Sequence, residues 1–68
     1  MTGDEARQII GKANAGELHV VAARLSVRPM DNTDDDWQRL EAACLLLGEH
    51  APPRAVRVLQ AHKSLRKE

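Results

Sequence analysis

The sequence predicts an all-α protein, a compact bundle of three to four short helices in one domain that covers residues 1–68. Three observations lead to this prediction. Apolar residues recur at intervals of three and four along most of the chain, which is the spacing of amphipathic helices. Two segments begin with residues typical of helix N-termini. Glycine or proline separates the periodic segments, as expected for short helices joined by turns.

The first helix is expected to begin just after Thr2. Residues 2–5 read Thr-Gly-Asp-Glu, the form of a capping box that satisfies backbone N–H groups at a helix start. The apolar residues that follow have helical spacing: Ala6, Ile9, Ile10 and Ala13. Residues 14–16, Asn-Ala-Gly, then read as the end of this helix.

Residues 17–30 fit two interpretations. One face of a helix would carry Leu18, Val21, Ala22 and Leu25. Residues 23–28 also alternate between apolar and polar side chains, which is the pattern of a half-buried strand. We favour a helix from Glu17 to Ser26 and keep a strand at residues 23–28 as the alternative. Pro29 ends either element.

The helix expected at Asp34–Gly48 has the clearest signals in the chain. Thr33 is the predicted N-cap, and the three aspartates that follow suit the positive end of the helix dipole. Gly48 suits the left-handed conformation that commonly ends a helix. One stripe of this helix is apolar: Trp37, Leu40, Ala43, Cys44 and Leu47. We expect this stripe to face the core of the protein.

The C-terminal half of the same helix is apolar on a second side, formed by Ala42, Leu45 and Leu46. A chain of 68 residues gains only about 3–5 kcal/mol from its own core, and its single cysteine cannot form a disulfide within the chain. We therefore expect self-association as a homodimer, with these three residues as the surface for the second copy or another protein partner. The alternative is that the chain's own helices cover them.

The last helix is expected from Pro53 to Arg66, after a turn at residues 49–53. Proline fits the first turn of a helix, where its missing N–H costs nothing. The buried side of this helix would use Ala55, Val58, Leu59, His62 and Leu65. A histidine on such a stripe is usually a partly buried side chain rather than a functional group.

The composition predicts a cytoplasmic protein that has no membrane contact. The N-terminus is acidic and polar and lacks the apolar core of a signal peptide. The longest apolar run, residues 42–47, is too short to span a bilayer. A single cysteine is typical of a reducing compartment.

No set of residues predicts catalysis. The three histidines lie in different elements and have no partners at metal-ligand spacing. Cys44 lies among apolar neighbours in the middle of its helix, whereas a nucleophilic cysteine needs a cationic neighbour or a helix N-terminus. The four glycines are scattered, which argues against a phosphate-binding loop. We predict a protein that is not an enzyme and has no metal, cofactor or small-molecule substrate.

Charge is unevenly distributed, although the net charge is zero. Residues 31–50 carry one basic and six acidic residues, which gives −5, and residues 51–68 carry five basic and one acidic, which gives +4. Both groups suit the dipoles of their helices. A zero net charge disfavours nucleic acid binding, which needs basic residues to neutralise phosphates.

Two segments nevertheless show features of DNA-binding proteins. Residues 40–48, followed by residues 54–59, resemble a helix-turn-helix, whose second helix enters the major groove. That resemblance implies DNA contacts from the last helix, with Arg54, Arg57 and Lys63 as candidates. The connection between the two helices is longer than the usual turn of that family.

Residues 24–29, followed by two helices, resemble the ribbon-helix-helix repressors. In that family, polar strand residues of a dimer read base edges, which implies contacts from Arg24, Ser26 and Arg28. Arg54 falls where that family usually has an apolar residue.

The leading functional hypothesis is a non-enzymatic regulatory or adaptor protein that acts by protein–protein binding, as a homodimer. The alternative is a small dimeric DNA-binding transcriptional regulator of helix-turn-helix or ribbon-helix-helix type. A structural subunit of a larger assembly is a second alternative. The two-sided apolar helix in so short a chain favours the first hypothesis.

Overall fold

The computed structural model describes residues 1–66 and contains four α-helices and two short 3₁₀ helices. The α-helices are α1 (Gly3–Ile10), α2 (Ala15–Val27), α3 (Asp34–Leu47) and α4 (Pro53–Arg66). The 3₁₀ helices η1 (Pro29–Asp31) and η2 (Gly48–His50) lie on either side of α3 in the chain. No strand occurs within these 66 residues, so the predicted all-α fold is confirmed.

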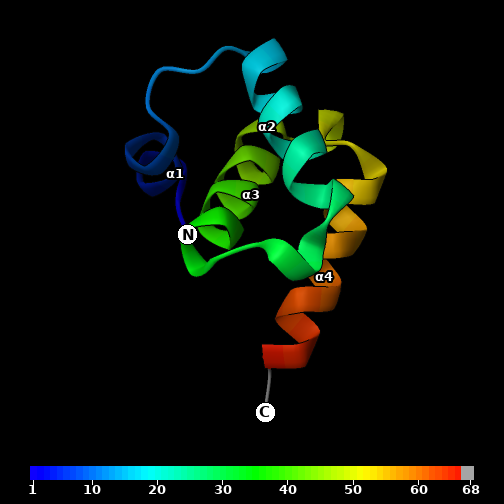
Figure 1. The fold of residues 1–68 in the computed structure, drawn as a ribbon. Helices are drawn as coiled ribbons and strands as arrows, with labels where there is room; N and C mark the ends of the chain where they lie inside the picture. The colour runs from blue at the N-terminus through cyan, green and yellow to red at the C-terminus, as the bar shows by residue number, and fades with distance from the viewer. Residues whose placement is uncertain (67–68) are drawn as a thin grey trace.

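Helix α3 is the centre of the fold, with α1 and α4 on opposite sides of it (Figure 1). This helix begins at the predicted N-cap, Thr33, which forms a capping box with Asp36. The Thr33 hydroxyl accepts a hydrogen bond from the Asp36 N–H at 3.2 Å, and the Asp36 carboxylate accepts one from the Thr33 N–H at 3.1 Å. Gly48 ends the helix at a φ of 59°, a conformation that other residues rarely adopt.

The segment with two interpretations is helical, because α2 runs from Ala15 to Val27 and includes residues 23–27. The Asn14 side chain caps this helix by accepting a hydrogen bond from the Glu17 N–H at 2.8 Å. The prediction that α1 reaches Ala13 is wrong. Helix α1 ends at Ile10, because Gly11 takes a φ of 81° and the chain turns there toward α2.

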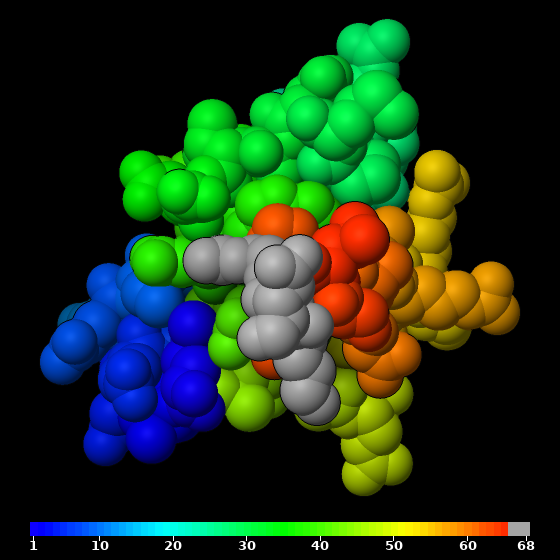
Figure 2. Space-filling view, turned by 90° about the horizontal axis from the view of Figure 1, so that it is seen from below, coloured from blue at the N-terminus to red at the C-terminus, as the bar shows by residue number. Residues whose placement is uncertain are grey.

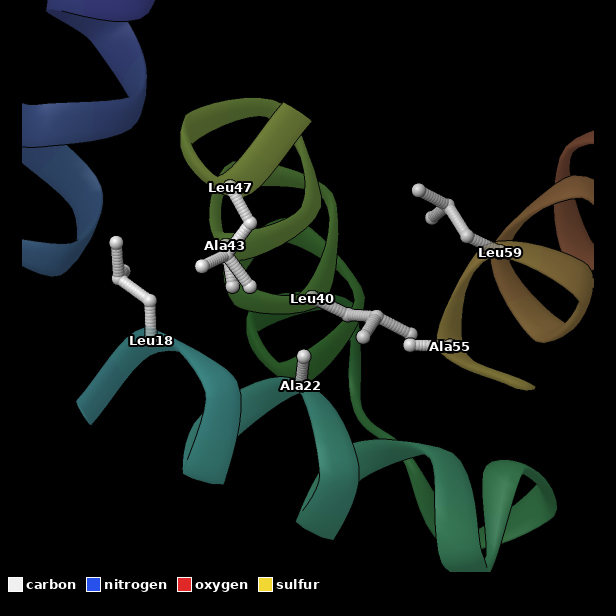
Figure 3. Packing of buried hydrophobic residues seen from close by; sticks show 7 residues of the cluster. All are labelled: Leu18, Ala22, Leu40, Ala43, Leu47, Ala55 and Leu59. Carbon is white, nitrogen blue, oxygen red and sulfur yellow. The ribbon is translucent and has the colours of Figure 1, made fainter. Parts of the chain in front are cut away.

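The main core lies where α2, α3 and α4 meet (Figure 3). Its buried residues are Leu18 and Ala22 from α2, Leu40, Ala43 and Leu47 from α3, and Ala55 and Leu59 from α4. In Figure 3 these side chains point toward one another across the three helices. Alanines make up much of this core, so the helices approach closely and bury few large side chains.

Helix α1 covers a different side of α3. Ala6 of α1 and Ala42 of α3 are both fully buried, and neither belongs to the main core cluster. Small side chains on both helices allow the two backbones to come close. The contact of α1 with α3 is therefore a second packing interface, which joins the main core at Ile10, the last residue of α1. The Thr2 capping box adds local stability to α1.

Candidate protein-binding groove

The predicted partner surface on α3 is only partly exposed. Ala42 is fully buried, because α1 packs on that side of α3, and it has no surface to offer a second chain. Leu46 is half-buried against the main core, and Leu45 is 44% exposed. A role for Leu45 and Leu46 in partner binding stays a prediction.

An apolar hollow of about 410 Å³ lies between η1, the start of α3 and the C-terminal half of α4. We name it the Met30 groove. Its lining residues are Pro29, Met30 and Asn32 from around η1, Trp37 from α3, and Val58, Ala61, His62 and Leu65 from α4. Figure 2 faces this end of the molecule and shows residues 28–33 (blue-green to green) beside the C-terminal half of α4 (orange to red).

Two strongly exposed apolar side chains line this groove. Met30 is 91% exposed and Leu65 is 79% exposed, which makes them the most exposed large hydrophobic residues in the described part of the chain. Single exposed apolar residues are common on protein surfaces. Two of them beside one apolar hollow, on elements far apart in sequence, form a patch of the kind that marks an interaction site.

A stacked pair of rings forms one wall of the Met30 groove. The ring centroids of Trp37 and His62 are 3.8 Å apart, and their planes differ by 9°. The same two residues line a more polar hollow together with Asp34, Gln38, Glu41, Leu59 and Lys63. The stack therefore separates the apolar groove from a charged neighbouring surface. His62 is half-buried, as its place on the apolar stripe of α4 predicted. The prediction that Leu65 lies on the buried side of this helix is wrong, because its side chain is strongly exposed.

Charged residues lie on the elements that form the Met30 groove, although none of them lines it. Asp31 of η1 is exposed, and Asp34 at the start of α3 is exposed and lines the more polar hollow on the other side of the Trp37–His62 stack. Arg54 and Arg57 are exposed on α4. Helical periodicity places them on the flank of α4 that carries Val58 and Ala61. Within residues 1–65, the ion pairs are Arg28–Asp31 at 4.0 Å and Lys63–Glu41 at 3.6 Å.

The candidate nucleic-acid contacts do not share one face. Ser26 is only 2% exposed, and its hydroxyl donates a hydrogen bond to the Ala23 carbonyl at 2.9 Å, so it presents no surface to a ligand. Five candidates are exposed: Arg24, Arg28, Arg54, Arg57 and Lys63. Lys63 pairs with Glu41 on the side of α4 away from Arg57, because six residues of helix turn through about 240°.

Cys44 has the character of a packing residue. It is half-buried against the main core, and burial raises the pKa of its thiol, while the positive charge of Lys63 acts in the opposite direction. The folded state therefore holds the thiol proton more tightly than the unfolded chain does. As the pH rises into the alkaline range in which the thiol titrates, this effect lowers the free energy of unfolding.

We expect Cys44 to react with iodoacetamide several-fold more slowly in the folded protein than in the urea-unfolded chain at the same alkaline pH. Replacing Lys63 with methionine removes the positive charge that opposes the effect of burial. The reaction of Cys44 with iodoacetamide in the folded protein should then become slower still. The rates can be measured by mass spectrometry of quenched samples. Equal rates in the folded and unfolded chain would contradict this assignment.

The described residues contain no group of three or more histidine, cysteine or acidic residues arranged to hold a metal ion. None of their helices combines the length and the apolar character needed to cross a membrane. Comparison of the chain with protein-family models, with curated proteins and with solved structures found no significant match.

Proposed function

We propose that this protein is a non-enzymatic regulatory or adaptor protein that acts by binding another protein through the Met30 groove. The observation that supports the proposal is the position of Met30 and Leu65, the most exposed large apolar side chains, beside one apolar hollow. Burying one such side chain contributes about 1.5–3 kcal/mol. Methionine also adapts its shape to a partner surface because it is unbranched and polarizable.

The chemistry of the groove suits an apolar protein surface better than a small molecule. Small-molecule sites usually enclose most of the ligand and present several convergent polar groups. In the Met30 groove, the Asn32 side-chain amide is already used, because it donates a hydrogen bond to the Leu25 carbonyl at 2.8 Å. The remaining lining is mostly apolar, and the Trp37–His62 stack gives it a flat, preorganised wall.

Site-specific photo-crosslinking tests this function. A photoreactive phenylalanine analogue, p-benzoylphenylalanine, replaces Met30 in one variant and Val20 in the control, in the cells that produce the protein. Val20 is 54% exposed on α2 and does not line the groove, so it controls for general surface crosslinking. Crosslinked products are identified by mass spectrometry.

We expect one dominant protein adduct from position 30 and none from position 20. The Leu65→Gln substitution should reduce the adduct from position 30, because it removes an apolar contact from the same groove. Equal, diffuse crosslinking from both positions would contradict binding at the groove.

A further inference from the structure

We propose that this protein has a second binding site, a hollow of about 370 Å³ between α2 and α3 that takes an acidic segment of a partner protein. We name it the Arg24 hollow. Its lining residues are Val21, Arg24 and Leu25 from α2 and Arg39 from α3. None of these residues lines the Met30 groove, so the inference goes beyond the proposed function and adds a separate surface.

The floor of the Arg24 hollow is apolar and is held in place by the core. Val21 and Leu25 are one turn apart on α2, and both are half-buried against the main core. Leu18 and Ala22, which neighbour them on α2, are buried and point toward α3 in Figure 3. Because this packing fixes α2 against α3, the floor is already formed in the free protein. It can receive an apolar side chain of a partner without rearrangement.

Two arginines, one from each helix, supply the positive charge of the Arg24 hollow. Arg24 and Arg39 both line the hollow and are exposed. Arg28, the next arginine of α2, pairs with Asp31 at 4.0 Å. By contrast, within residues 1–65 no carboxylate lies at ion-pair distance from either arginine of the hollow. A guanidinium binds a carboxylate through two parallel hydrogen bonds, so this pair suits a ligand that carries carboxylates.

The acidic residues of the chain leave the Arg24 hollow positive. Residues 18–30 contain no aspartate or glutamate. On α3, the Asp36 carboxylate is used in the capping box, where it accepts a hydrogen bond from the Thr33 N–H at 3.1 Å. Asp35 lies one turn before Arg39 but does not line the hollow. The lining therefore carries two positive charges and no negative charge, which complements an acidic ligand.

An apolar floor with only two cations favours a protein segment over a nucleic acid. A duplex requires several phosphates to be neutralised, and the three aspartates at residues 34–36, just before Arg39, repel a polyanion. Single strands stack on aromatic side chains, but Trp37 is the only tryptophan in a chain without tyrosine or phenylalanine, and it lines other hollows. An acidic segment places one apolar side chain on the floor and its flanking carboxylates on the two arginines.

NMR titration of the isotope-labelled full chain tests the inference. The probe is a capped peptide with two glutamates on each side of one leucine. We expect chemical-shift changes concentrated on α2 at residues 21–25 and around Arg39, with binding that weakens as salt is added. Replacing the glutamates of the peptide with glutamine, or its leucine with alanine, should each weaken binding several-fold.

Variants of the protein assign the binding to the two arginines. Arg24→Gln and Arg39→Gln should each weaken the acidic peptide several-fold, because each removes a charged hydrogen-bond donor. Arg57→Gln is the matched control, since Arg57 is exposed on α4 and does not line the hollow. The double variant Arg24→Glu with Arg39→Glu should lose the acidic peptide and bind its counterpart with lysine in place of glutamate. Circular dichroism should show an unchanged fold, because both positions are exposed.

Position 20 stays a control for the Met30 groove. Val20 lies about 100° from Val21 around α2 and does not line the Arg24 hollow. A further pair of variants separates the two sites. Met30→Gln should leave binding of the acidic peptide intact, and Arg24→Gln should leave the photo-adduct from position 30 intact.

Three results would overturn the Arg24 hollow as a site for an acidic segment. One is the absence of shifts up to the solubility limit of the peptide. Another is equal binding of the glutamate and glutamine peptides. The third is displacement of the peptide by inorganic phosphate or duplex DNA that binds the same residues more tightly, which would assign the arginines to phosphate groups.

Discussion

Replacing Leu40 with alanine is expected to destabilise the protein by about 3 kcal/mol and to leave a large share of molecules unfolded at room temperature. Leu40 is fully buried and is the largest apolar side chain with no exposed surface. Its loss leaves a cavity where α2, α3 and α4 meet. A domain of this length has only about 3–5 kcal/mol of stability to lose. Urea unfolding followed by circular dichroism measures the effect.

Leu45→Ala is the matched control, because it makes the same chemical change on the same helix. Leu45 is 44% exposed, so its truncation removes less buried area and leaves no closed cavity. We expect a loss of about 1 kcal/mol. Similar losses for the two variants would contradict a core organised around Leu40.

Two adjacent alanines of α3 should respond differently to the same substitution. Ala43→Glu places a carboxylate in the main core among α2, α3 and α4 and is expected to unfold the whole domain. Ala42→Glu places it under α1. The buried residues of the main core come from the other three helices, and α1 adds the half-buried Ile10 at the edge of that core. We therefore expect release of α1 to relieve the buried charge while the rest stays folded.

Amide hydrogen exchange resolves the two outcomes by segment. In Ala42→Glu, amides of residues 3–10 should lose protection, whereas those of α3 and α4 should keep most of theirs. In Ala43→Glu, protection should be lost throughout. Global unfolding of both variants would show that α1 and the main core form one cooperative unit.

The helix boundaries could be predicted wherever a local hydrogen bond decides them. Thr2 and Thr33 each form the capping box that their sequences indicate, and Gly48 has the positive φ expected of a terminal glycine. The end of α1 could not be predicted in this way, because the apolar spacing continues past Gly11 to Ala13 although the backbone turns at Gly11. Periodicity alone does not show where a glycine takes a left-handed conformation.

The candidate site was harder to predict, because it depends on which helices pack together. The second apolar side of α3 was recognised, but the burial of Ala42 by α1 is a tertiary contact that α3 alone does not encode. In the sequence, Met30 follows Pro29 between two predicted helices and belongs to no pattern that indicates a role. Its place beside Leu65 follows from the return of α4 along α3, which brings together residues 35 positions apart.

The alanine-rich core has a consequence for the response of this protein to heat. Of the nine buried apolar residues in the described part of the chain, five are alanine, so folding removes little apolar area from water for each helix contact. The heat-capacity change of unfolding increases with apolar area exposed, and the enthalpy of unfolding increases with chain length. The heat-capacity change of unfolding is therefore small because the core buries little apolar area, and the enthalpy of unfolding is small because the chain is short. The curve of stability against temperature should be shallow, and the chain should lose its helices over a wide span of temperature rather than at a sharp midpoint.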